Sequence, residues 1–279
     1  MFRRSYPPIL SLYTGDAIKK AISNRKMTDL KNRSLFDKNK CIRMNKGETS
    51  SQLDLIDATK KWFETIVIGP QKLCPFAPYL RHDDNLLRIV KSEATTIPEA
   101  IADLEYEVME LVGNSSDEND ENDEHENHSH HETTLVVFDD KRFEEVREFR
   151  SFVRLSWNMQ LEAIVEKGFG NDLQLVLFHP KATHDTYTEY NCPSEDLEKD
   201  MMHFSFHTTD AADYTIRSPF PTVHLLREKD VMRAVKSGYP NLESLPARNK
   251  AKLRDLGLIK CDLMLQQCYT SNQYNDAAT

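Results

Sequence analysis

Three kinds of side chain in this sequence can carry chemistry: a loop cysteine, two histidines and two arginines. The cysteine, Cys74, lies between Gly69 and Pro78 in a stretch that holds three prolines and therefore predicts a loop. A loop cysteine beside a lysine, here Lys72, can have a lowered thiol pKa and act as a nucleophile or a metal ligand. The alternative is a small buried thiol that only fills space.

The two histidines are candidate general bases. His179 directly follows the apolar run 173–178, and Pro180 turns the chain there. His224 lies inside a second apolar run, 222–227. If the fold brings both histidines to Cys74, the three form a thiolate–imidazole pair or a three-ligand metal site. The alternative for His179 is a hydrogen-bonding role at the edge of a sheet.

The two arginines flank the strand that carries His224. Arg217 precedes it and Arg227 ends it. Either guanidinium could make a bidentate contact to a carboxylate or phosphate, which predicts a small anionic ligand. The alternative is an internal ion pair with one of the many acids.

The elements that must position these residues alternate along the chain. Helical spacing of apolar residues predicts helices over 55–67, 98–111, 143–164, 228–236 and 244–256. Short apolar runs predict strands over 86–90, 133–138, 173–178 and 222–227. This order predicts an α/β fold: a single two- or three-layer domain with a small central mixed sheet of about four strands and flanking helices.

At these residues the sequence resembles the uncharacterised family called domain of unknown function 1415. The resemblance is carried by three segments, in order along the chain: the loop through Leu73-Cys74-Pro75-Phe76-Ala77, then Phe178-His179-Pro180, then residues 217–228, which read RSPFPTVHLLRE. It covers roughly residues 55–257. The resemblance names no reaction, but it implies that Ser218 belongs to the shared motifs together with Cys74, His179, Arg217, His224 and Arg227.

Two segments of biased composition lie outside this pattern. Residues 1–46 hold twelve Lys and Arg against three Asp, although the whole chain carries a net charge of −9. Residues 113–132 hold eight carboxylates and four histidines, which predicts a solvated, disordered loop. We therefore expect a basic leader over 1–48, an α/β domain over 49–260 that carries this loop, and a C-terminal tail over 261–279.

Composition also limits the class of protein. No apolar stretch is long enough to span a membrane, and an acidic body argues against nucleic acid as a partner. Only 8 glycines are present and none forms a standard nucleotide loop, while five scattered cysteines favour a reducing compartment over a disulfide scaffold. The basic leader is typical of an organellar transit peptide, for a mitochondrion or plastid; the alternative is a cytoplasmic protein with a basic leader.

Two hypotheses for the function follow. In the first, the chain is an enzyme that acts on a small anionic metabolite, with His179, His224 and Cys74 as catalytic groups and Arg217, Ser218 and Arg227 as substrate-binding groups. In the second, it is a non-catalytic ligand-binding or assembly module, and the motif residues hold the fold together. The sequence leaves open the reaction, any cofactor or metal, and the oligomeric state.

Overall fold

The computed structural model describes residues 49–81, 86–113, 131–185, 209–236 and 244–269. The expected leader and most of the acidic loop fall outside these residues. Both ends of that loop are described: Gly113 is the last residue of a helix, and at the other end His131 is buried and the Tyr79 hydroxyl donates a hydrogen bond to the Glu132 carboxylate. The acidic loop therefore joins the packed domain about two residues earlier than expected.

A four-stranded mixed sheet forms the centre of the fold. Its strands are β1 (Leu87–Lys91), β2 (Thr133–Val137), β3 (Leu173–Phe178) and β4 (Thr222–Arg227), in the spatial order β1-β2-β4-β3. β1 and β2 are parallel, and β4 runs antiparallel to both β2 and β3. The carboxyl ends of β1, β2 and β3 therefore meet at one edge of the sheet, where β4 begins. The predicted strand bounds match the observed bounds to within one residue at each end.

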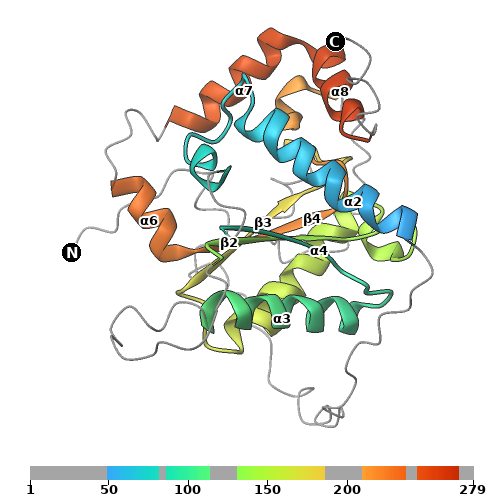
Figure 1. Ribbon diagram of the computed structural model, residues 1–279, viewed down its shortest axis with the longest axis vertical. Helices are drawn as coiled ribbons and strands as arrows, with labels where there is room; N and C mark the ends of the chain where they lie inside the picture. The colour runs from blue at the N-terminus through green and yellow to red at the C-terminus, as the bar shows by residue number, and fades with distance from the viewer. Residues whose placement is uncertain (1–48, 82–85, 114–130, 186–208, 237–243, 270–279) are drawn as a thin grey trace, which may run out of the picture.

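Helices cover both faces of this sheet, so the domain has three layers (Figure 1). On one face lie α3 (Ile97–Gly113) and α4 (Phe149–Met159), and on the other lie α2 (Thr49–Trp62) and α8 (Leu258–Gln267). Helices α6 (Glu228–Lys236) and α7 (Leu245–Leu256) complete the described part of the chain. All five residues of β2 are buried, because this central strand has apolar layers on both sides.

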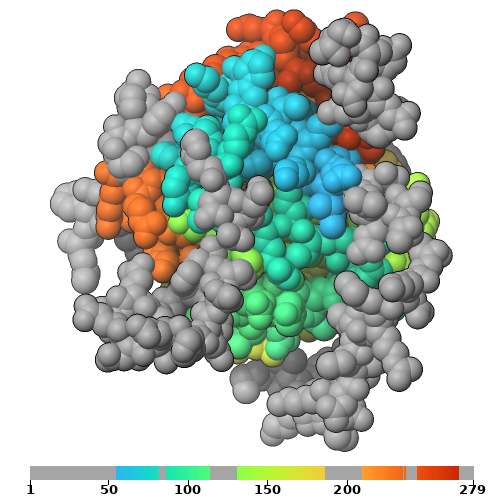
Figure 2. Space-filling view, viewed as in Figure 1, coloured from blue at the N-terminus to red at the C-terminus, as the bar shows by residue number. Residues whose placement is uncertain are grey.

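A separate apolar cluster lies between each face of the sheet and the helices that cover it. The cluster under α3 and α4 includes Phe138, Phe152, Leu104 and Leu175, which are fully buried. The cluster on the other face is built around Trp62, Leu135 and Tyr214. In the space-filling view, α2 and the loop after it cover this second face, with α7 and α8 above them and α3 below (Figure 2).

Helix α8 shows that the packed domain continues past residue 260. Cys261, Leu265 and Cys268 are buried and belong to the cluster on the α2 face. Residue 260, where we expected the domain to end and the tail to begin, lies inside this helix. Within the described residues, no helix is both long and apolar enough to cross a bilayer.

The predicted helix 143–164 is shorter and less regular than expected. Phe143 has an extended backbone (φ −123°, ψ 107°), and a short 3-10 turn, Glu144–Val146, follows it. Helix α4 begins only at Phe149 and continues as the π-helical segment Gln160–Val165. The predicted apolar stripe is therefore present, but its residues after Phe143 lie in a 3-10 turn, an α-helix and a π-helical segment.

The first helix also ends in a π-helical segment, Phe63–Ile68, which leads into the cysteine loop. Gly69 closes this segment, as the sequence predicts. A Cβ atom at residue 69 would lie 1.9 Å from the Thr65 carbonyl oxygen, so only glycine fits there without a shift of the backbone.

Candidate functional site

His179 stands at the carboxyl end of β3, where its ring packs between Phe149 and Phe152 of α4. The Lys181 N–H donates to Nδ1 at 3.0 Å, so the proton lies on Nε2, which is 2.9 Å from the Val146 carbonyl oxygen. The residue is 1% exposed, and burial lowers its pKa to about 4. His179 is therefore a neutral ring whose two nitrogens are both bonded to backbone.

His224 lies in the middle of β4, beside Phe178. The Thr133 hydroxyl donates to the Leu225 carbonyl oxygen at 2.7 Å, so the ring Nε2–H donates to the Thr133 oxygen at 2.6 Å. Burial lowers the pKa of His224 to about 4. This histidine is also neutral near pH 7.

The two histidines lie on opposite faces of the sheet. His179 packs with α4, whereas His224 is paired with Leu135 in the register of β2 and faces the α2 side. The backbone of the sheet separates them, so they do not share one substrate or one metal ion. Among the residues that the structure describes, no group of three His, Cys, Asp or Glu side chains is placed to hold a metal ion. The sequence left open whether Cys74 meets both histidines, and the structure places the two histidines on different faces of the sheet.

Cys74 lies on the α2 side, in a loop that is held from two directions. The Cys74 N–H donates to the Val67 carbonyl oxygen at 3.3 Å. From α7, Asn249 Nδ2 donates to the Leu73 carbonyl oxygen at 2.6 Å, and Lys252 Nζ donates to that of Gln71 at 2.9 Å. Between these contacts, Lys72 has φ +48°, the left-handed region that non-glycine residues seldom occupy.

The thiol of Cys74 is better suited to packing than to attack on a substrate. Its side chain packs against the apolar cluster of the α2 face. Burial raises the pKa of the thiol above its ordinary value, and hydrogen bonds from the backbone of Phe76 and Ala77 only partly oppose this. Cys74 is half-buried, and these contacts fit the alternative interpretation of a small thiol that fills space.

This environment predicts slow alkylation of Cys74. In the folded chain at pH 7.5, we expect iodoacetamide to modify Cys74 several-fold more slowly than in the chain unfolded in urea, because only the thiolate reacts. Peptide mass spectrometry after timed quenching measures the rate at this residue alone. A folded-state rate above the unfolded one would instead restore Cys74 as a nucleophile.

Arg227 caps a helix. It is 8% exposed, and its Nε and Nη2 donate to the Leu111 carbonyl oxygen at 3.1 and 2.9 Å. Nη2 also donates to the His131 carbonyl oxygen at 2.6 Å. The guanidinium thus satisfies a carbonyl group of the last turn of α3, where a positive charge is also favourable to the helix dipole.

The two arginines predicted to bind one anion lie at opposite ends of β4. Arg217 precedes the strand and Arg227 ends it. A six-residue strand spans about 17 Å, so the two guanidinium groups serve different parts of the molecule. Ser218 is fully buried, and its hydroxyl donates to the Phe220 carbonyl oxygen at 2.6 Å. Arg227 makes three hydrogen bonds to backbone carbonyl oxygens and its Nη1 lies 4.0 Å from Asp230, whereas Arg217 makes one such bond.

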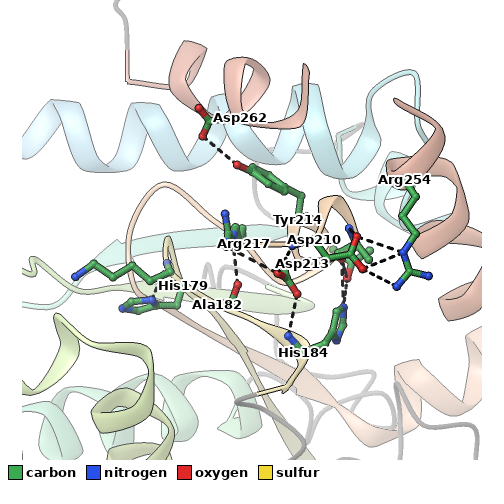
Figure 3. Close-up of polar contacts among 12 residues, drawn as sticks. His179, Ala182, His184, Asp210, Asp213, Tyr214, Arg217, Arg254 and Asp262 are labelled. Atoms are coloured by element: carbon green, nitrogen blue, oxygen red, sulfur yellow. Dashed lines mark hydrogen bonds and ion pairs between the residues drawn. The ribbon is translucent and has the colours of Figure 1, made fainter. Parts of the chain in front are cut away.

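Arg217 lies at the carboxyl edge of the sheet, between β3 and a 3-10 segment, η7 (Ala211–Thr215) (Figure 3). Its Nε donates to the Ala182 carbonyl oxygen at 3.0 Å, and its guanidinium carbon lies 4.7 Å from the centre of the Tyr214 ring. The side chain is 11% exposed. Within the described residues, the carboxylate that comes within 4 Å is Asp213, whose Oδ2 lies 3.9 Å from Nη2, beyond hydrogen-bond distance.

The carboxylate of Asp213 is already bonded to backbone. Its Oδ1 accepts the His184 N–H at 2.9 Å, and its Oδ2 accepts the Asp210 N–H at 3.1 Å. Asp210 in turn binds Arg254 through two nitrogens of the guanidinium. Asp210 and Asp213 thus cap η7 reciprocally. Arg217 lies 3.9 Å from Asp213 and makes no hydrogen bond to it.

His184 and Tyr214 also belong to the network of contacts around Asp210, Asp213 and Arg217, and neither was predicted from the sequence. His184 Nε2 lies 2.8 Å from the Thr215 hydroxyl, and burial, assisted by the charge of Lys250, lowers the pKa of His184. The Tyr214 hydroxyl donates to Asp262 of α8 at 2.9 Å, and burial raises the pKa of Tyr214 to about 12. The one available signal was the spacing Asp210-x-x-Asp213, which has the form of a capping box.

Comparison with known proteins agrees with the resemblance seen in the motifs. A family model described as "Protein of unknown function (DUF1415)" matches residues 54–262, about three quarters of the chain. No curated protein and no solved structure matches the chain.

Proposed function

We propose that this chain, which belongs to the DUF1415 family, binds a small oxyanion at the carboxyl edge of its sheet through Arg217. The observation that carries this proposal is the environment of the Arg217 guanidinium. The Arg217 side chain is 11% exposed, and the described carboxylate within 4 Å of its guanidinium, that of Asp213, lies beyond hydrogen-bond distance.

Burial of the Arg217 charge is costly unless an anion pairs with the guanidinium. A buried charge is stabilised by a partner and by hydrogen bonds to its donors. Arg217 donates from Nε to the Ala182 carbonyl oxygen, its flat face lies over the Tyr214 ring, and its side chain also hydrogen-bonds the Tyr214 hydroxyl. The edge formed by Nη1 and Nη2 has the spacing of two carboxylate or phosphate oxygens, and within the described residues no carboxylate lies within hydrogen-bond distance of it.

The position in the fold supports the same proposal. Open α/β sheets bind ligands outside the carboxyl ends of their strands. Arg217 is held at this edge by the Ala182 carbonyl group, four residues after the end of β3. Two charged neighbours along the edge already have partners: Lys181 pairs with Glu148 at 2.5 Å, and Arg254 pairs with Asp210.

The separation of the candidate catalytic groups favours binding over catalysis. An enzyme built on His179, His224 and Cys74 would need them around one substrate, and the two histidines face different helical layers. Both histidines are neutral and hydrogen-bonded. Of the two hypotheses drawn from the sequence, the ligand-binding module is therefore the one that we carry forward.

Thermal denaturation of the full chain tests the proposal. At 50 mM sodium acetate or phosphate, against sodium chloride of equal ionic strength, we expect the midpoint to rise by about 3–6 °C if the dissociation constant is in the low millimolar range. Arg217→Lys keeps the charge but loses the fork of donors, and should abolish most of this rise.

Arg227→Lys is the matched control, because it changes a second buried arginine that lies at the other end of β4. It should lower the midpoint in chloride but leave the rise caused by the anion unchanged. If neither anion raises the midpoint of the wild-type chain, or if the rise survives Arg217→Lys, then Arg217 is not an oxyanion site.

A further inference from the structure

We infer that the oxyanion bound at Arg217 is a singly charged carboxylate rather than a phosphate. This inference rests on the proposed function and concerns the class of ligand that the same site accepts. Two independent features of the site lead to it: the acidic groups around the guanidinium, and the way in which the guanidinium is held.

The acidic groups around Arg217 favour a ligand with one negative charge over a ligand with two. On one side stands Asp213, with its Oδ2 3.9 Å from Nη2. On the other side, the Tyr214 ring that lies against Arg217 donates its hydroxyl to Asp262 at 2.9 Å (Figure 3). Each of these carboxylates repels a bound anion, and the repulsion is about twice as large for a dianion as for a monoanion.

Two cations of the surrounding network already have carboxylate partners. Arg254 is bound by Asp210 through its Nε and Nη2. Lys181 is paired with Glu148.

The fixed plane of the guanidinium gives the second argument. Nε is anchored to the Ala182 carbonyl oxygen, and the Tyr214 ring lies against one face. The donors that remain lie along one edge and in one plane, which matches the two coplanar oxygens of a carboxylate. A tetrahedral phosphate has further oxygens outside this plane, and sites for it supply donors from several directions, such as backbone N–H nests or helix N-termini.

Midpoint shifts measured as a function of anion concentration give the two affinities. At pH 8, where phosphate is largely a dianion, we expect acetate to bind the wild-type chain about tenfold more tightly than phosphate, as two repelling carboxylates would produce. Only the part of each shift that is lost in Arg217→Lys is counted, because phosphate also stabilises proteins by exclusion from their surface.

Asp262→Asn tests the electrostatic part of the inference. The amide oxygen can still accept the Tyr214 hydroxyl, but the charge is gone, so the preference for acetate over phosphate should narrow by about two- to fivefold. Asp255→Asn removes an exposed carboxylate of α7 and serves as the matched control, with an unchanged preference.

The outcomes separate the two proposals. If phosphate binds at Arg217 as tightly as acetate or more tightly, the carboxylate inference is overturned and the oxyanion site stands. If neither anion gives a shift that depends on Arg217, both fail. Where Arg217→Lys does not fold, Arg217→Gln provides the same subtraction.

Discussion

Replacing Arg227 with methionine should lower the free energy of unfolding by about 3–5 kcal/mol, because it leaves two buried carbonyl oxygens without donors. Those oxygens belong to Leu111, in the last turn of α3, and to His131, where the chain re-enters the domain before β2. Methionine retains most of the apolar stem, so lost packing makes a small contribution. Denaturation of the full chain in urea measures the change.

Arg233→Met is the matched control for this prediction. Arg233 lies on α6, pairs with Asp230 at 3.1 Å, and has a side chain that is 65% exposed. An exposed pair of this kind should contribute less than about 1 kcal/mol. A stable Arg227→Met chain that no longer responds to acetate would show the opposite assignment, with Arg227 as the anion-binding arginine and not a helix cap.

The strands were predictable because short apolar runs leave few alternatives. β3 and β4 have the bounds expected from the runs 173–178 and 222–227. In β3, Leu173, Leu175 and Leu177 are buried and the residues between them are half-buried, as period-two alternation requires. Alternation also places His179 on the same face as these leucines, which the contact with α4 confirms.

The site was less predictable, because alternation within one strand does not say how two strands are paired. In the observed register, Val176 of β3 lies opposite His224 of β4, so His224 shares a face with Val176 and not with Leu175 or His179. One residue of shift in this register would have placed both histidines on one face. Strand pairing depends on contacts between residues that are far apart in the sequence, and the hydrophobic pattern within one strand does not predict these contacts.

The network around η7 was missed for a different reason. Residues 181–216 show no helical or strand periodicity, and a five-residue 3-10 segment is too short to produce one. Asp210 and Asp213 act by capping backbone N–H groups, a role that depends on local geometry. Arg217 was identified because it stands in a recognisable motif, although the partner expected for it, Arg227, serves another end of the fold.

Acidification should destabilise the domain through His179, which is buried, and His224, which is half-buried. His179 and His224 have a pKa of about 4 in the folded chain and about 6.5 when unfolded, so the unfolded state binds more protons between these values. Stability is therefore complete above pH 6.5 and falls as the pH drops toward 4. From pH 7 to pH 5, each histidine should remove about 2 kcal/mol from the free energy of unfolding.

Urea denaturation at pH 7 and pH 5 measures this loss in the wild-type chain and in His179→Asn and His224→Asn. Each variant is expected to be less stable than the wild type at pH 7, because ring contacts and one hydrogen bond are lost. The difference between the two pH values should nevertheless shrink by about 2 kcal/mol in each variant, since one titrating group is gone.

The change in pH dependence separates protonation from simple loss of packing. Val176→Ala, in the strand paired with His224, is the matched control: it should lower stability by a similar amount at both pH values and leave their difference unchanged. If His179→Asn behaves like Val176→Ala, the ring of His179 takes up a proton in the folded state. In that case it must have access to water and to a charged partner that its contacts with Phe149, Phe152 and two backbone groups do not provide.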